Sequence, residues 1–178
     1  GKLCNKLGEF RITNSSILST QVFHYTYVEN DVVYLLDQST GNFDTLYNFK
    51  ANIGDKWRHP PTSRPRCASS HVTVTDTGHV IIQGQSLRSF TLSQVRTQPI
   101  LGSAGLFGAV YERIGAIECF PFDPNNMCPW GTDSYTGGPL NCFSDYQISN
   151  FKSNFTKDCV TYTDLKDLTA SSASVRLY

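Results

Sequence analysis

The sequence contains little of what marks a nucleic-acid-binding, membrane-spanning or helical protein. Its 178 residues include 15 basic and 15 acidic side chains, so the formal net charge is zero, whereas nucleic-acid binding usually requires a basic surface. No run approaches the roughly 18 continuous apolar residues of a spanning helix, and no window has convincing helical periodicity. We therefore expect no nucleic-acid partner, no membrane span and little helix.

Metal-type spacing is also lacking. No two cysteines form a C-x-x-C pair, and Cys67 with His71 supplies only half of a zinc site. The oxygen-rich residues 123–139 do not contain the D-x-[DN]-x-[DN]-G pattern of a calcium loop. The sequence predicts neither a metal nor a cofactor.

Six cysteines are the most informative feature that is present: Cys4, Cys67, Cys119, Cys128, Cys142 and Cys159. An even number without metal spacing is typical of a disulfide framework, which predicts an oxidising location outside the cell. Sequence alone does not fix the pairing. We favour Cys119–Cys128 and Cys142–Cys159 as local bridges, which leaves Cys4 to pair with Cys67.

Strand signals dominate the first third of the chain. Residues 22–28 (VFHYTYV) and 31–36 are rich in β-branched and aromatic side chains, and the polar pair Glu29-Asn30 separates them. This pattern predicts a hairpin. Residues 44–49 predict a third strand.

A second hairpin is predicted in the middle of the chain. Residues 71–75 (HVTVT) alternate apolar and polar side chains, and residues 79–83 return after Asp76-Thr77-Gly78. Turn residues between two alternating runs predict a hairpin that reverses at 76–78. Residues 86–95 alternate in the same way and predict the next strand.

Residues 107–120 are apolar enough to predict one long, mostly buried strand, in which Gly108 and Gly115 permit a bulge. Glu112 and Glu118 would then lie about 20 Å apart along the strand. Paired acids of a glycosidase stand roughly 5–9.5 Å apart. This spacing, with no complete nucleophile motif elsewhere, leads us not to expect an enzyme.

Consecutive hairpins with little helix predict an all-β fold, an antiparallel barrel or sandwich stapled by disulfides. We expect one β domain over residues 1–163. Residues 164–178 contain a run of serine and alanine, which is typical of a linker.

Aromatic side chains in predicted loops are the main binding candidates. Trp57 lies in the basic, proline-rich residues 56–66, and Trp130 and Tyr135 lie in residues 123–139. Loop aromatics are common on sugar-binding and protein-binding faces, and they serve equally to cover the open end of a barrel. Both interpretations stay open at this point.

Six segments, taken in order, resemble a recurrent class of secreted proteins from Bacteroidetes-type bacteria, in which a β-rich domain of undefined activity precedes a type IX secretion C-terminal sorting domain. The segments are VFHYTYVENDVVYLL, DTLYNFKANIGDKW, HVTVTDTGHVIIQGQSLRSFTL, YERIGAIECFPF, LNCFSDYQ and SVRLY. The last is similar to the opening of the sorting domain, so we expect residues 164–178 to lead into such a domain. Arg113 departs from the class, which often has glycine there.

The resemblance implies export across the outer membrane and release or attachment at the cell surface, and it implies no catalytic residues. Proteins of such bacteria carry O-glycans at Asp-Ser/Thr-aliphatic sites. Asp44-Thr45-Leu46 is similar to that pattern, which makes Thr45 a glycosylation candidate.

We expect a non-enzymatic secreted or cell-surface protein: an adhesin, a matrix component or an assembly subunit. Its edge strands would contact other surface proteins, glycans or further copies of itself. The alternative is an extracellular module that binds or cleaves carbohydrate. In that case Trp57, Trp130 and an acid such as Glu112 would line its groove.

Overall fold

The computed structural model describes residues 3–13, 16–38, 40–58, 71–95, 106–118, 140 and 142–154, and the regular elements of these residues are all β-strands. The strands are β1 (Asn5–Thr13), β2 (Ser16–Glu29), β3 (Val32–Asp37), β4 (Asn42–Asn48), β5 (Lys56–Arg58), β6 (His71–Ile82), β7 (Gln85–Val95), β8 (Leu106–Tyr111), β9 (Gly115–Ala116), β10 (Cys142–Phe143) and β11 (Phe151–Lys152). Within these ranges no helix is long and apolar enough to cross a membrane. The all-β prediction is confirmed for the described residues.

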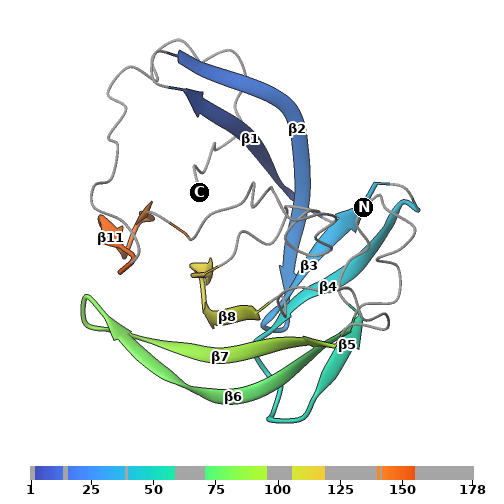
Figure 1. Cartoon of the computed structure of the whole chain (residues 1–178), viewed down its shortest axis with the longest axis vertical. Helices are drawn as coiled ribbons and strands as arrows, with labels where there is room; N and C mark the ends of the chain where they lie inside the picture. Colours follow the sequence, from blue (N-terminus) through green and yellow to red (C-terminus); the bar gives the residue numbers. More distant parts are fainter. Residues whose placement is uncertain are drawn as a thin grey trace.

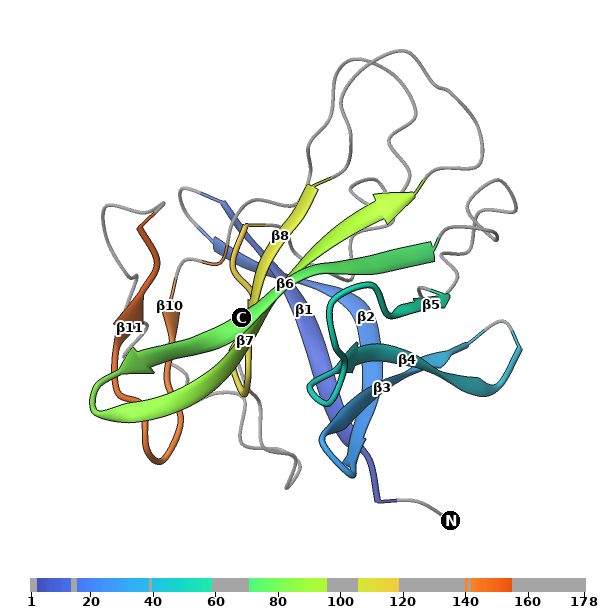
Figure 2. The same cartoon turned by 90° about the horizontal axis from the view of Figure 1, so that it is seen from below.

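The strands pair antiparallel with their neighbours in the chain. One sheet has the order β1-β2-β3-β4, a second has the order β5-β6-β7-β8-β9, and β10 pairs with β11. The β6–β7 hairpin is long and curled, and β8 and β11 lie on its concave side (Figure 1). Seen from below, β6 and β7 cross the molecule with a strong twist (Figure 2). Consecutive hairpins, as predicted, therefore build both large sheets.

The first predicted hairpin is confirmed as β2–β3. Glu29 pairs with Val32, and the two residues between them, Asn30 and Asp31, have φ values of +52° and +60°. Positive φ at both central residues is the mark of a type I′ turn, whose twist matches that of the strands. Asn and Asp tolerate this conformation better than other residues with a side chain, so the polar break fixes the turn.

The predicted turn at residues 76–78 is wrong. β6 continues through them to Ile82, and the chain reverses at Gln83-Gly84, which have φ values of +50° and +79°. Val74 pairs with Leu92 and Asp76 with Thr91, so Thr75 is an extra residue and forms a β-bulge. Asp76, Thr77 and Gly78 follow the bulge and pair regularly with Thr91, Phe90 and Ser89, so residues typical of a turn here continue the strand.

Thr75 also changes which face the apolar side chains of β6 occupy. Before the bulge Val74 lies opposite Leu92, and after it Val80 lies opposite Leu87. Side chains alternate along β7, so Leu87 and Leu92, an odd number of residues apart, lie on opposite faces of the hairpin. One alternating sequence therefore serves two cores.

Two hydrophobic clusters fill these two faces. The cluster that joins the two large sheets consists of Leu35, Leu46, Tyr47, Phe49, Ala51, Val72, Val74, Phe90, Leu92, Val110 and Ala116. The cluster that joins the β6–β7 tip to the β10–β11 hairpin consists of Ile82, Leu87, Ile114, Ile117, Leu140, Phe143 and Ile148. The β6–β7 hairpin thus contributes side chains to both clusters and connects them.

Residues 106–118 do not form the single long strand that their composition predicts. β8 ends at Tyr111, the chain turns at residues 112–114, and β9 returns beside β8 with Gly115 opposite Tyr111. Arg113 in this turn has a φ of +70°. A large charged residue gives no sequence signal for a positive φ, because L-residues with side chains rarely adopt it. The predicted boundary between residues 163 and 164 lies outside the described residues.

Candidate functional site: the β1–β2 arm

The first two strands form a ribbon that extends beyond their sheet. β1 pairs with β2 along its whole length, from Asn5 opposite Thr26 to Thr13 opposite Ser16. β3 pairs only with the last four residues of β2, from Thr26 to Glu29. We call β1 together with residues 16–25 of β2 the arm. It reaches away from the curled β6–β7 hairpin (Figure 1).

The backbone edges of the arm are open among the described residues. No described strand pairs with the outer edge of β1, or with the other edge of β2 between residues 16 and 22. Where the ladder with β3 ends, the Gln38 side-chain amide donates a hydrogen bond to the backbone carbonyl of Phe23. Beyond this cap, the rows of backbone N–H and C=O groups are not paired with any other described strand, and unpaired groups of this kind are a template for another strand.

A bend divides the arm into a base and a tip. Gly8 lies opposite Phe23 and Phe10 lies opposite Ser19, so three residues of β2 stand against one residue of β1. Extra residues on one strand bend a ribbon and increase its twist. The bend is visible as the curve of β2 in Figure 1. The tip, residues 10–13 with 16–19, is thus turned away from the sheet that supports the base.

The base of the arm is anchored to the sheet and carries an exposed aromatic ring. Leu7 is buried, whereas the Phe23 side chain is 37% exposed. The Lys6 ammonium group lies 3.8 Å from the centroid of the Phe23 ring. A cation–π contact at an exposed site contributes about 0.5–1 kcal/mol, so it helps to hold the pairing at the base.

Trp57 does not lie in a loop, as the sequence suggests, but on β5. Its indole N–H donates a hydrogen bond to the Leu46 carbonyl at 3.3 Å, and its ring meets Phe90 edge to face with centroids 6.3 Å apart. The side chain is partly buried against the first hydrophobic cluster. This position gives Trp57 a packing role, and its predicted binding role stays a prediction. Trp130 and Tyr135 lie outside the described residues.

Replacing Trp57 with phenylalanine is expected to lower the free energy of unfolding by about 1 kcal/mol, because the indole hydrogen bond is lost while much of the ring contact remains. Replacement with alanine is expected to cost about 3 kcal/mol, since most of the packing is lost. Denaturant titration of both variants measures the two losses. Unchanged midpoints for both would contradict the packing role and favour a contact role instead.

Thr45, the glycosylation candidate, lies half-buried on β4 opposite Tyr34 of β3. Tyr34 in turn lies opposite Tyr27 and stacks on its ring at 4.6 Å, and Phe43 meets Tyr27 edge to face at 4.7 Å. A glycan at Thr45 would therefore leave the sheet beside an aromatic cluster. Glycosylation itself stays a prediction.

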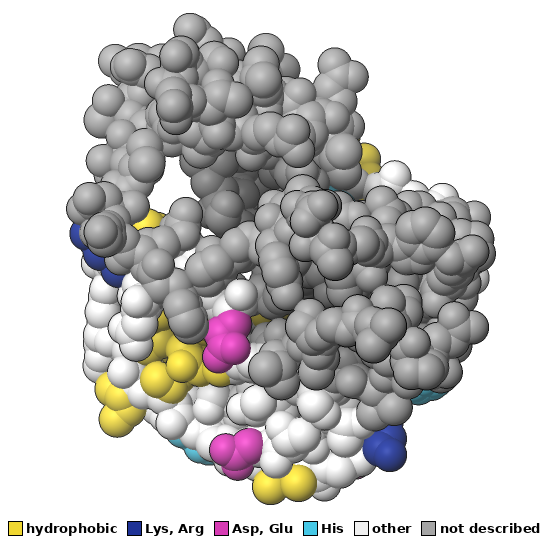
Figure 3. Space-filling view, in the orientation of Figure 1, with side chains coloured by type: hydrophobic (Ala, Val, Ile, Leu, Met, Phe, Trp, Pro, Cys, Tyr) yellow, Lys and Arg dark blue, Asp and Glu magenta, His cyan; other side chains and the backbone are white. Residues whose placement is uncertain are grey.

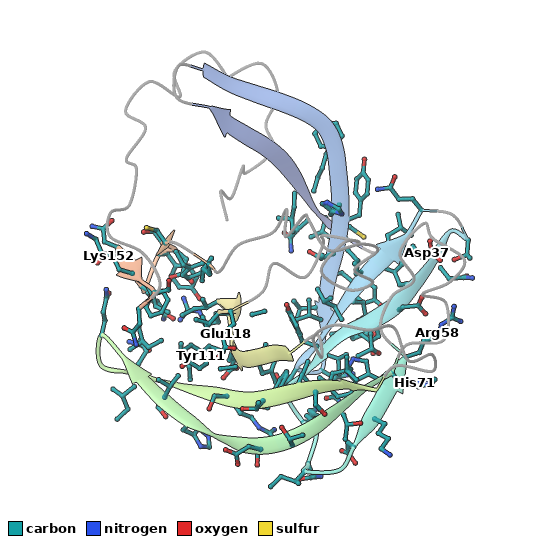
Figure 4. The ribbon with its side chains drawn as sticks, in the orientation of Figure 1. Asp37, Arg58, His71, Tyr111, Glu118 and Lys152 are labelled. Atoms are coloured by element: carbon teal, nitrogen blue, oxygen red, sulfur yellow. The ribbon has the colours of Figure 1, made fainter. Side chains whose placement is uncertain are left out.

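The two acids of residues 106–118 have separate surroundings. The Glu112 carboxylate accepts the backbone N–H of Arg88 at 2.9 Å, which ties it to β7. The Glu118 carboxylate lies over Gly108, where an added Cβ would come within 2.3 Å of it. Figure 4 shows Glu118 near Tyr111, well away from Asp37. Glu112 thus has a structural role, because it joins the β8–β9 turn to β7. Glu112 and Glu118 do not form a catalytic pair of carboxylates.

The cysteines are only partly covered by the described residues. Cys4 is half-buried just before β1, and Cys142 is half-buried at the start of β10. Cys67, Cys119, Cys128 and Cys159 lie outside the described ranges. The three predicted pairings therefore stay predictions.

A charged clip, which the sequence did not predict, joins the β8–β9 turn to the segment between β10 and β11. Arg113 Nη2 lies 2.5 Å from Asp145 Oδ2, and Arg113 Nη1 donates to the side-chain carbonyl of Gln147. Asp145 Oδ1 accepts the backbone N–H groups of Gln147 and Ile148, each at 2.8 Å. The Asp145 side chain is only 5% exposed. We call these four residues the Arg113 clip.

Burial by itself raises the pKa of the Asp145 carboxyl group. The two backbone N–H groups and the Arg113 guanidinium together outweigh burial, so this pKa lies below its ordinary value. The carboxylate is consequently ionised at neutral pH and holds the clip closed. The clip is a structural element that fixes the second core.

The tip of the β6–β7 hairpin is clamped to the same segment. The Gln83 side-chain amide donates to the Ser149 carbonyl, and the Ser149 N–H donates back to Gln83 Oε1 at 2.9 Å. A side-chain amide that exchanges two hydrogen bonds with one backbone residue imitates a strand pair. The clip and the clamp together hold the β10–β11 hairpin at one end of the curled sheet.

The other described residues give no second candidate site. Within the described ranges, no group of three or more histidine, cysteine, aspartate or glutamate side chains is placed to hold a metal ion. Acidic and basic side chains of the described residues are scattered on the face in Figure 3 and form no patch of one sign. Comparisons of the chain with protein-family models, with curated proteins and with solved structures find no match. The arm is therefore the feature from which a function is inferred.

Proposed function

We propose that this chain is a non-enzymatic secreted or cell-surface protein that assembles through its arm. The observation that carries the proposal is that, among the strands that the structure describes, nothing pairs with the backbone edges of the arm beyond its last pair with β3. Two-stranded ribbons are at best marginally stable in water, and an open strand edge is a template for another strand. Strand addition is a common way for extracellular subunits to associate.

The proposed location is outside the cell, by the type IX route that the resemblance implies, in a bacterium of the Bacteroidetes type. Six cysteines without metal-type spacing support an oxidising location, and we further propose that they form disulfides that close the sheets into a barrel or sandwich. A glycan at Thr45 belongs to the same proposal. Partners would be other surface proteins or glycans.

Intact mass of protein from the natural producer tests the location. Three disulfides require a gain of about six hydrogens on reduction, and additional hexose mass would mark a glycoprotein. Protease treatment of whole cells should digest the protein. Six free thiols, together with protection from protease, would overturn the proposed location.

A shortened arm tests the assembly role. Replacing residues 9–22 with Asn-Gly connects the paired residues Gly8 and Phe23 through a type I′ turn and leaves the base intact. We expect the shortened protein to melt within about 4 °C of wild type, corresponding to less than about 1 kcal/mol, and to be released from the cell surface into the medium. Retention equal to that of wild type would contradict a role for the arm.

A further inference from the structure

We propose that the strand occupying the outer edge of β1 is β1 of a second copy of this chain. The two strands would run antiparallel about a two-fold axis and join two β1–β4 sheets into one continuous sheet. This inference rests on the proposed function and names the partner of the arm. It follows from the geometry of the edge, from the order of charges along β1 and from the net charge of the chain.

The geometry of the edge suits self-pairing. A two-fold interface brings the same strand of each copy together, and two identical strands related in this way must be antiparallel. β1 is nine residues long, longer than a typical strand. The extra residues at the bend belong to β2 and not to β1, so the outer edge of β1 has no insertion to interrupt a ladder. Eight strands in one sheet is within the usual range.

The order of charges selects a register. Centring the pairing on Phe10 places Glu9 of each copy opposite Arg11 of the other, so the interface gains two opposite-charge pairs. Centring it on Glu9 would place the two Glu9 residues opposite each other. Centring it between Gly8 and Glu9 would place Lys6 opposite Arg11. Like charges directly opposite destabilise a strand pair, which disfavours both of these registers. Centring the pairing between Leu7 and Gly8 would place Lys6 opposite Glu9, but it would pair only residues 5–10 of β1. The register centred on Phe10 pairs residues 7–13 and is favoured because its ladder is longer.

The charge of the whole chain permits this association. The formal net charge is zero, so two copies approach without the long-range repulsion that keeps strongly charged proteins apart. Pairing of the two arms would also give each ribbon the third strand that independent stability requires. A second copy satisfies both conditions at once.

Charge exchange within β1 tests the partner and the register together. The variants E9R and R11E each place like charges opposite each other in both pairs of the proposed interface. A mixture of the two restores opposite charges in both pairs, and so does the double variant E9R/R11E. Light scattering after size exclusion measures the mass, and sedimentation over a range of concentrations gives the dissociation constant.

We expect the wild type and the double variant to have twice the 19.9 kDa mass of the chain. Each single variant should be a monomer, with a dissociation constant raised roughly tenfold or more. The equimolar mixture should return to the dimer, which also shows that the single variants are folded. A monomeric wild type, dimeric single variants or a mixture that stays monomeric would each overturn the inference.

The test separates this inference from the proposed function. Surface retention of E9R on the producing cells is measured beside its mass in solution. Loss of both supports the second copy as the partner. If the wild type is a monomer yet is retained at the surface only with an intact arm, the second copy is excluded and the assembly role of the arm remains. If the shortened arm has no effect either, both proposals fail.

Discussion

Replacing Asp145 with alanine is expected to lower the free energy of unfolding by about 3 kcal/mol, because breaking a buried ion pair leaves the other groups without partners. Three donors lose their acceptor: the Arg113 guanidinium, and the N–H groups of Gln147 and Ile148. Arg113 is 23% exposed, so water recovers part of the loss. Denaturant titration followed by tryptophan fluorescence measures the change.

Two further variants separate the charge from the hydrogen bonds. Asp145→Asn retains an oxygen that can accept the two backbone N–H groups but removes the charge, so we expect a smaller loss than with alanine. Arg113→Ala should cost much less in the Asp145→Ala background than in the wild type, because the partner is already missing. Fully additive losses would mean that the two side chains are not coupled.

The same carboxyl group makes stability depend on pH in a defined direction. Its native pKa lies below the value of about 3.9 expected in an unfolded chain, so folding favours the ionised form. The stabilisation is complete above that unfolded value and is lost as the pH falls through the lower native pKa. Between pH 5 and pH 2 the melting temperature of the wild type should fall more steeply than that of Asp145→Asn.

The sequence predicts local pairing well where the signal is local. The β2–β3 hairpin follows from two runs of β-branched and aromatic residues around Asn30-Asp31, and the structure reverses the chain there. The turn at Arg113 has no such signal. Arg113 has a φ of +70°, and its side chain contacts Asp145, which lies 32 residues away in the chain. A local sequence pattern cannot predict a contact between residues that far apart.

The location of the arm is not predictable in the same way. Residues 5–13 mix glycine and charged residues, and residues 16–21 are mostly polar, so neither has the composition of a strong strand. Open edges were expected in general. Which strand would be open depends on where β3 stops pairing with β2, and that is a property of the assembled sheet. The sequence therefore gives no signal for the position of the arm, and its role as a contact surface stays a proposal.

The bulge at Thr75 determines which side chains of β6 are buried after it. It therefore leads to a second prediction of a large loss of stability. The neighbours Ile81 and Ile82 have the same side chain, but Ile81 is 76% exposed and Ile82 is 8% exposed and packs in the second cluster. Ile82→Ala is expected to lower the free energy of unfolding by about 3 kcal/mol, because it removes buried methyl groups and leaves a cavity.

Ile81→Ala is the matched control and should cost less than about 1 kcal/mol, mainly through the lower strand propensity of alanine. Both variants keep the turn at Gln83-Gly84 and the same chain length, so the difference reports only which face each residue occupies. If Thr75 were not an extra residue, Val80 and Ile82 would share a face with Val74, and the second cluster would take Ile81 instead. Denaturant titration in which Ile81→Ala is the more damaging change would therefore contradict the bulge and the division of the hairpin between two cores.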